Sequence, residues 1–387
     1  MRNARKSFAI FAAATVLGVA GAVGVNAYAD PYDVFGRLPA PLQPANLRVH
    51  AALALSSGRP HFMFLGSSRA GAFGEPVRAS VESSATITLT GTTIYEERRF
   101  FEHALAVAPI KRVALLLDFI TFNVHQAPTT MESVLAVAPD GSKTNALAGY
   151  LPALVSLDAL KASIDVLRAP NALAGTATPE LTPARARYEH VACHLMQPGG
   201  GFRPSPLQRF DIRDDQTGRT TLAEYERILE LAHEHDIELT LLIAPTHAWL
   251  IHGIDALGHW QTLEAWKRGL VSANERVAAR TGRTPFALWT FEDVTTVTTE
   301  EVPPGFAGSL RYFPEPSHFG PHVARFVLER AYATNQAEVP ADFGELLTSA
   351  TIERSLAGTR ARLRAWRDAH PEVVELVAKA VRGECTF

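Results

Sequence analysis

Two short segments, far apart in the 387-residue sequence, carry side chains that could act together in catalysis. The first is Gly66-Ser67-Ser68-Arg69, which directly follows the apolar run Phe62–Leu65. A serine at a sharp turn from a strand into a helix is exposed at the sheet edge, and the positive end of the helix would lie near any oxyanion formed there. The same residues could simply cap the helix. Because serine is a poor nucleophile without a base, the nucleophile interpretation requires a histidine close to the serine.

A candidate base lies near the end of the chain, in a proline-bounded loop that contains Glu315 and His318. A carboxylate three residues before a histidine can accept a hydrogen bond from one ring nitrogen. This contact fixes the tautomer and stabilises the imidazolium that forms when the ring takes a proton. The sequence contains 14 histidines, so a single pair of this kind also arises by chance.

The elements that would position these residues are short strands alternating with helices. Such alternation predicts a five-stranded parallel sheet covered by helices on both faces, a three-layer α/β/α sandwich. Reactive groups collect at the carboxyl ends of the strands in such sheets. The expected strands are Phe62–Leu65, Ala85–Leu89, Val113–Leu117, Glu238–Ile243 and Phe286–Thr290.

Two further side chains belong to this edge of the predicted sheet. His247 ends the fourth strand, where it could bind substrate or serve as an ordinary buried histidine. Arg69 could hold an acidic group of a substrate or form an ion pair with Asp118. The segment His233–Asp236 resembles a metal site in composition, but it falls at a helix end and is interpreted as a solvated terminus. No metal and no cofactor are predicted.

The domain organisation follows from where the strand pattern is interrupted. The α/β domain is expected over residues 30–335, with a helical insertion at about 123–218 that could cover the site. Residues 336–387 are charged and helical in pattern, so they are expected to form a C-terminal helical extension.

Composition limits the classes of function. With 37 Lys and Arg against 40 Asp and Glu, the formal net charge is −3, which argues against nucleic acid as a partner. The two cysteines, Cys193 and Cys385, exclude a cysteine-based zinc site and permit one disulfide. The sequence gives no signal for an oligomeric state.

The N-terminus contains a hydrophobic segment. Basic residues at positions 2, 5 and 6 precede an uncharged apolar stretch from Phe8 to about Tyr28, long enough to cross a bilayer with the basic end in the cytoplasm. Ala27-Tyr28-Ala29 is also an acceptable signal-peptidase site. Residues 1–29 are therefore expected to be a membrane anchor or a cleaved signal peptide. In both cases the body lies in the periplasm or outside the cell.

The order of these motifs resembles the SGNH, or GDSL-like, hydrolase superfamily. Its Gly-Asp-Ser block corresponds to Gly66-Ser67-Ser68, which places the nucleophile on Ser68, and its Asp-x-x-His block corresponds to Glu315–His318. The oxyanion-hole glycine of the second block corresponds to Gly91. The third block, Gly-x-Asn-Asp, has no match, and Asn123 is the candidate side-chain oxyanion donor in its place.

Nearly the whole chain is similar to single-pass bacterial membrane proteins with an exported SGNH-like domain. More distant relatives include exported alginate O-acetylation proteins and the D-alanyl transfer protein of teichoic acids, which act on cell-surface polymers. The pattern begins before the possible cleavage site and so favours a retained anchor. The matching segments are Asn26 with Asp30-Pro31, Gly66–Arg69, Leu117–Phe119, Pro245–Ala248 and Glu315–Phe319.

The resemblance implies an exported serine esterase or O-acyltransferase that acts on ester-linked acyl groups, with acetyl expected, of a cell-surface polysaccharide. Ser68 would attack, His318 would take its proton and Glu315 would orient the ring. Gly91, Asn123, Arg69 and His247 would contribute to oxyanion or substrate binding. One alternative is a non-catalytic protein of the same fold that binds or assembles an exopolysaccharide. The other is a flavodoxin-like phosphate binder that uses the turn at Gly66.

Overall fold

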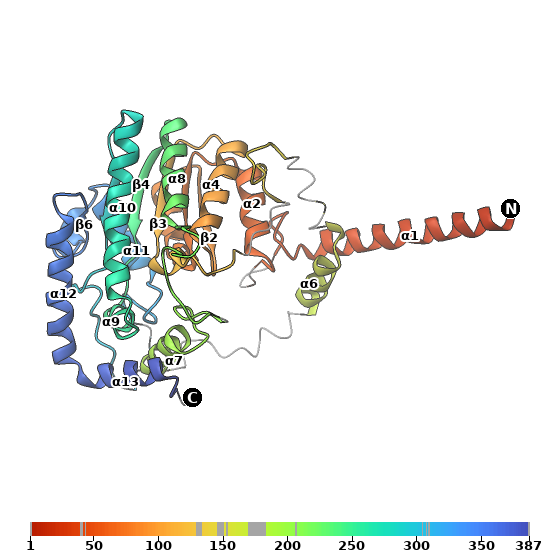
Figure 1. Ribbon diagram of the computed structural model, residues 1–387. Coiled ribbons are helices and arrows are strands. Elements are labelled where there is room, and N and C mark those ends of the chain that lie inside the picture. The colour runs from red at the N-terminus through yellow and green to blue at the C-terminus, as the bar shows by residue number, and fades with distance from the viewer. Residues whose placement is uncertain are drawn as a thin grey trace. The chain divides into compact units, whose positions relative to one another are not determined.

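A mostly parallel sheet of six strands, in the order β2-β1-β3-β4-β5-β6, runs through the body of the protein in the computed structural model (Figure 1). The described residues are 2–385 except 39–41, 43, 129–133, 145–150, 152–153, 169–182, 206, 304, 307 and 309. The strands β1 to β5 are all parallel to one another, as predicted. The strands are β1 (Phe62–Ser67), β2 (Ser84–Leu89), β3 (Arg112–Leu117), β4 (Glu238–Ile243), β5 (Ala287–Thr290) and β6 (Glu345–Leu346).

The central strands form because their residues are apolar on both faces. Every residue of β1 is buried, and so is every residue of β3 and β4 after the first. Continuous apolar runs of this kind are typical of parallel strands covered by helices on both sides. The carboxyl ends of β1, β3 and β4 therefore meet at one edge of the sheet, where Ser67, Leu117 and Ile243 are the last strand residues.

The sheet has one strand more than the five that the sequence predicts. The additional strand, β6, is antiparallel to β5 and pairs Leu346 with Trp289 and Glu345 with Thr290. Two residues are too few to produce a periodic pattern, so this strand has no signal in the sequence. Because β6 lies at 345–346, residues beyond 335 contribute to the sheet as well as to helices.

Helices cover both faces of the sheet (Figure 1). On one face α8 and α10 pack against each other, and α3 packs against α11 on the other. The helices α8 and α10 lie in the connections from β3 to β4 and from β4 to β5, which run in one direction along the sheet. The helix α3 lies in the connection from β1 to β2, which runs in the opposite direction, and it therefore covers the other face. The helices described in this body are α3 (Gly74–Ser80), α4 (Ile94–Val107, of which residues 103–107 belong to the smaller unit described below), α7 (Ala184–Met196), α8 (Leu222–Glu234), α9 (Ala248–Ala256), α10 (Trp260–Thr281), α11 (Pro321–Ala331), α12 (Ile352–Ala369) and α13 (Pro371–Arg382).

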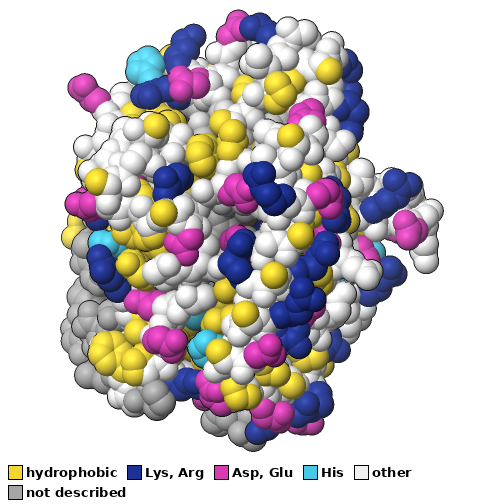
Figure 2. Space-filling view, turned by 90° about the vertical axis from the view of Figure 1, so that its left-hand side faces the viewer, with side chains coloured by type: hydrophobic (Ala, Val, Ile, Leu, Met, Phe, Trp, Pro, Cys, Tyr) yellow, Lys and Arg dark blue, Asp and Glu magenta, His cyan; other side chains and the backbone are white. Residues whose placement is uncertain are grey.

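The surface over α12 carries charges of both signs. Arg360 pairs with Glu264 of α10, and Arg367 pairs with Asp255 of α9 at 2.6 Å. Figure 2 shows basic and acidic side chains interspersed on this face. A mixed surface of this kind does not provide the broad basic footprint that nucleic acid requires.

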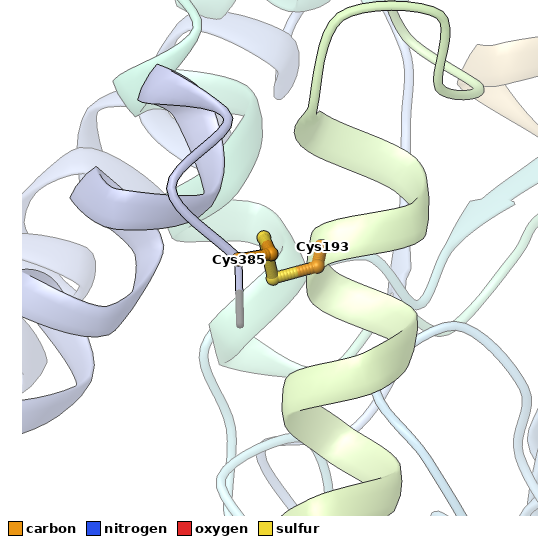
Figure 3. The surroundings of a disulfide bond; sticks show 2 residues. All are labelled: Cys193 and Cys385. Atoms are coloured by element: carbon orange, nitrogen blue, oxygen red, sulfur yellow. A yellow bond between two sulfur atoms is a disulfide. The ribbon is translucent and has the colours of Figure 1, made fainter. Parts of the chain in front are cut away.

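A disulfide joins Cys193 of α7 to Cys385, which follows α13 (Figure 3). The two cysteines are 192 positions apart, and their Cα atoms lie 6.2 Å from each other. Disulfides persist in oxidising compartments, so this bond is consistent with an exported body.

Replacing both cysteines, as in Cys193→Ser with Cys385→Ser, is expected to lower the free energy of unfolding by about 2–5 kcal/mol, because the bond restricts a long loop of the unfolded chain. Denaturant unfolding, with and without a reductant, measures the effect. The reductant should destabilise the wild-type protein and leave the double variant unchanged. A double variant as stable as the wild type would contradict the expectation.

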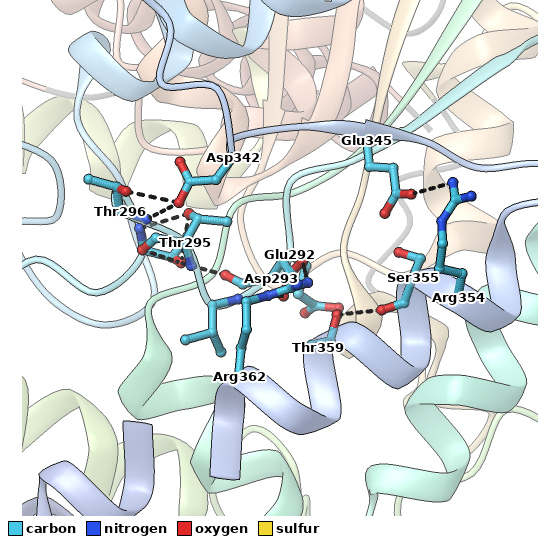
Figure 4. A network of polar contacts seen from close by, with 12 residues as sticks. Glu292, Asp293, Thr295, Thr296, Asp342, Glu345, Arg354, Ser355, Thr359 and Arg362 are labelled. Atoms are coloured by element: carbon cyan, nitrogen blue, oxygen red, sulfur yellow. Dashed lines mark hydrogen bonds and ion pairs between the residues drawn. The ribbon is translucent and has the colours of Figure 1, made fainter. Parts of the chain in front are cut away.

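Polar contacts attach the C-terminal helices to the loop after β5 (Figure 4). Arg362 of α12 forms an ion pair with Asp293. The backbone N–H and the hydroxyl of Thr296 both donate to Asp342, at 2.7 and 2.8 Å. The C-terminal extension is therefore packed onto the body that contains the sheet.

A second, smaller compact unit comprises residues 1–59, 103–108 and 130–177. It contains α1 (Arg2–Ala29), α2 (Leu47–Gly58) and α6 (Leu157–Arg168). Within α1, the segment Lys6–Ala29 contains an 18-residue window with a mean hydropathy of 2.2, and no residue of that window is buried inside the protein. An exposed apolar helix of this length, together with the disulfide, indicates export or membrane anchoring.

Candidate active site

The end of β1 is shaped by a close contact between strands. A Cβ atom on Gly66 would lie 2.8 Å from the Cβ of Leu116 in β3, so only glycine fits at this position. Ser67 then ends the strand, and its Oγ accepts a hydrogen bond from the N–H of Arg69 at 3.2 Å. Ser67 is thus the cap of the short 3₁₀ helix η1 (Ser68–Phe73). Because the capping is done by Ser67, the hydroxyl of Ser68 is available for another role.

The structure brings Ser68, His318 and Glu315 together. The Oγ of Ser68 lies 2.8 Å from Nε2 of His318, and Oε1 of Glu315 contacts Nδ1 of the same ring. The carboxylate also accepts the N–H groups of Ser317 at 2.6 Å and of His318 at 2.8 Å, which fixes its position in the loop. With Nδ1 donating to Glu315, Nε2 is the acceptor for the serine hydroxyl. This is the arrangement of a nucleophile with a base oriented by a carboxylate.

An open cavity of about 530 Å³ adjoins these residues, and Ser68, Gly91 and His318 are in its lining. Gly91 follows β2 with a φ of +63°, a conformation that favours glycine, and its carbonyl accepts from the side chain of Gln126 at 3.1 Å. Ser68 is the first residue of η1, so its N–H has no partner within the helix. The side chain of His318 is 44% exposed, so the ring is accessible from solvent.

One wall of the cavity comes from α7 and from the glycine-rich loop that follows it. Val191, His194 and Leu195 of α7 line the cavity, as do Gly199–Phe202 of the loop. A Cβ on Gly200 would lie 2.4 Å from the carbonyl oxygen of His194, so the loop can fold onto the end of α7 only with glycine there. This loop belongs to the insertion at about 123–218 that the sequence predicts could cover the site, but the sequence does not indicate which residues of the insertion line the cavity.

Behind the serine turn lies a buried cluster of charged and polar groups. Asp118, which follows β3, accepts a hydrogen bond from Oγ of Ser67 and pairs with Arg69 through an Nη1–Oδ1 distance of 2.8 Å. The side chain of Asp118 is fully buried, and that of Arg69 is 8% exposed. Arg69 also donates to Oγ1 of Thr246 at 3.1 Å. Of the two sequence interpretations of Arg69, the structure shows the ion pair with Asp118.

The cluster continues to the end of β5. Thr246 donates to Oε1 of Glu292 at 3.3 Å, and Nζ of Lys267 lies 3.2 Å from the other oxygen of that carboxylate. These residues connect the carboxyl ends of several strands, so the position of the serine turn depends on the whole edge of the sheet. Buried networks of this kind are sensitive to the loss of any one member.

A buried carboxyl group, Glu97 in the first turn of α4, adjoins this cluster. Burial raises its pKa well above the usual value, and the charges of Asp118 and Glu96 raise it further. The pKa of Glu97 is therefore shifted in the direction that favours the neutral carboxyl group beside the Asp118–Arg69 pair.

The structure places His247 and Asn123 outside the lining of this cavity. His247 caps α9, accepting from the N–H of Trp249 at 3.3 Å, and its Nε2 donates to the carbonyl of Glu300 at 3.0 Å. Burial lowers the pKa of His247 to about 4, so the ring is neutral near pH 7. Both ring nitrogens are thus occupied by the protein's own backbone.

Asn123 is likewise engaged within its own loop. Its amide N–H donates to the carbonyl of Arg209 at 3.0 Å, and its carbonyl oxygen accepts from the N–H of His125 at 3.2 Å. It lines a separate cavity of about 330 Å³. Asn123 therefore lies at a different cavity from Ser68 and Gly91.

Comparison of the sequence with models of known protein families and with curated proteins gives no match.

Proposed function

We propose that the protein is a membrane-anchored, exported serine esterase or O-acyltransferase of the SGNH type. The observation that carries the proposal is the 2.8 Å contact between Ser68 Oγ and His318 Nε2, with Glu315 on the other ring nitrogen. The open cavity of about 530 Å³ beside these atoms gives room for an ester.

In the proposed reaction, His318 Nε2 removes the proton of Ser68 as Oγ attacks the acyl carbon. The N–H groups of Ser68 and Gly91 stabilise the resulting oxyanion, and Glu315 stabilises the imidazolium. The tetrahedral intermediate collapses when His318 returns the proton to the leaving alcohol, so Ser68 becomes acylated. Water, or a hydroxyl of a second glycan, then attacks the acyl-serine with His318 again acting as the base. The bond between the acyl carbon and Oγ breaks, His318 returns the proton to Ser68, and the free acid or the new ester leaves.

The proposed substrate is an acylated cell-surface polysaccharide, with acetyl as the acyl group. Two features support a large substrate: the cavity is open, and the catalytic ring itself is partly exposed. The resemblance of the motifs to proteins that act on cell-surface polymers supports the polysaccharide class.

Contacts at the end of α1 support a retained anchor. Asn26 is 1% exposed. Its amide donates to the carbonyl of Leu154 at 2.7 Å, and its Oδ1 accepts from Oγ of Ser163 at 2.8 Å. Cleavage after Ala29 would remove Asn26 and leave the buried hydroxyl of Ser163 without this partner, which is costly. A signal peptide that is discarded has no need of such contacts.

A fluorophosphonate probe tests the proposal directly, because it forms a covalent bond only with an activated serine. The full-length protein in detergent is expected to be labelled on Ser68, as located by mass spectrometry of the labelled peptide. Labelling should vanish in Ser68→Ala and persist, at least in part, in Ser67→Ala, since Ser67 only caps η1 and contacts Asp118. A folded wild-type protein that takes up no probe would replace the proposal with the non-catalytic, polysaccharide-binding alternative.

A further inference from the structure

The helix α6 of the smaller unit presents two different faces. On its inner face, Ala159 and Ser163 are fully buried, and the hydroxyl of Ser163 donates to Asn26 of α1. The carbonyl of Leu154, just before α6, accepts from the same asparagine. The helix is thus fastened by hydrogen bonds to the last turn of α1 (Figure 1).

One side of α6, next to its buried face, is apolar and exposed. Leu157 is 82% exposed, Ile164 is 38% exposed and Leu167 is 48% exposed. Their spacing of seven and three residues places them on one side of the helix. Single exposed leucines are ordinary, but a continuous stripe on one helix indicates a surface that another apolar phase covers. Leu151 and Val155, just before the helix, add exposed apolar area at 58% and 45%.

Charged residues are arranged around this stripe in a specific order. At 100° per residue, Lys161 and Arg168 border the stripe, whereas Asp158 and Asp165 lie farther round the helix. All four residues are exposed. Long basic side chains beside an apolar stripe can reach phosphate groups while the stripe itself is in contact with acyl chains.

The helix α6 is attached to the part of α1 that would lie at the membrane surface. The apolar segment Lys6–Ala29 has 24 residues and so extends about 36 Å, compared with a hydrocarbon core of about 30 Å. Its last turn therefore reaches the headgroup region. Asn26, which holds α6, lies in that last turn. The exposed stripe of α6 is thus held next to the point where α1 would leave the bilayer.

We propose that α6 docks on the non-cytoplasmic surface of the lipid bilayer, with Leu157, Ile164 and Leu167 facing the acyl chains and Lys161 and Arg168 at the level of the phosphates. This inference rests on the retained anchor of the proposed function. It adds a second lipid contact to the smaller unit besides the span itself. Because α6 is attached to the end of α1, which spans the bilayer in the proposed function, we infer that lipid is what contacts the stripe.

Site-specific fluorescence in reconstituted full-length protein tests the docking. Single cysteines are introduced by Leu157→Cys and Ile164→Cys on the stripe, and by Asp165→Cys on the charged side of the same helix, about 80° from Leu157, as the matched control. A further variant, Leu17→Cys, reports on the span. Each is labelled with bimane, with the native cysteines kept in their disulfide, in vesicles of phosphatidylethanolamine and phosphatidylglycerol in equal parts.

The labels at 157 and 164 are expected to be quenched several-fold less by aqueous iodide than the label at 165, and several-fold more by a nitroxide on the lipid acyl chain. Equal quenching at all three positions, with the label at 17 shielded from iodide, would overturn the docking and leave the anchor intact. Access of iodide to the label at 17 would overturn both. Protection from iodide without quenching by lipid nitroxide would indicate a protein partner, such as a second copy, and would also overturn the proposal. Probe labelling of Ser68 judges the enzymatic function separately, because none of the substituted residues lines the cavity.

Discussion

His318→Ala is expected to lower the turnover of a small aryl acetate by about 10⁴-fold, because removal of the base leaves only binding and oxyanion stabilisation. In the proposed mechanism, Nε2 of His318 accepts the proton of Ser68, whose Oγ lies 2.8 Å away. Glu315→Gln is expected to lose less, about 10²- to 10³-fold. The glutamine oxygen can still accept from Nδ1, but it carries no charge to stabilise the imidazolium.

Steady-state hydrolysis of the aryl acetate by the purified variants, with circular dichroism to confirm folding, measures these losses. His235→Ala is the control, since His235 is exposed at the end of α8. Glu315→Asp is expected to keep much of the activity, because the shorter carboxylate can still approach the ring. Full activity of a folded His318→Ala variant would exclude the proposed base and favour the binding protein.

Asp118→Asn is expected to lower the free energy of unfolding by about 3–5 kcal/mol, because it leaves the buried charge of Arg69 without its counterion. The side chains of this pair are almost completely inaccessible to water, so solvent cannot replace the lost interaction. The substitution also disturbs the contact that Asp118 makes with Ser67, which caps η1 and so positions Ser68. A loss of esterase activity is expected to accompany the loss of stability.

The matched control is Asp236→Asn, which removes the same charge from an exposed ion pair with Arg283. Exposed pairs contribute about 1 kcal/mol or less, so this variant should be nearly as stable as the wild type. Denaturant unfolding of the three proteins compares them. If both substitutions cost the same small amount, the buried cluster does not stabilise the serine turn.

The strands and the serine turn could be predicted because they depend on local pattern. All five predicted strands lie within two residues of their observed bounds, since each is an apolar run that ends in turn residues. Ser68, Glu315 and His318 were predicted as a set from motif order, and the structure brings the three side chains together. Their catalytic role stays a prediction until the probe experiment is done.

Features that depend on the tertiary arrangement could not be predicted in the same way. The residues next to His247 in the sequence are compatible with a side chain that faces a cavity and with one that bonds to the backbone of Glu300. Only the fold shows that the second of these is present. Asn123 is predicted as a donor because it stands in place of the missing Gly-x-Asn-Asp block, but the direction of its amide depends on the loop at Arg209. Likewise, nothing local to Glu97 indicates that Asp118 lies near it.

The separation of Ser68 and His318 along the chain has a consequence for the newly made protein. The two residues are 250 positions apart, which at a synthesis rate of roughly 5–20 residues per second corresponds to an interval of about 10–50 s. During that interval the serine turn exists without its base. Until His318 has been synthesised, the nascent polypeptide therefore lacks the base that the proposed mechanism requires.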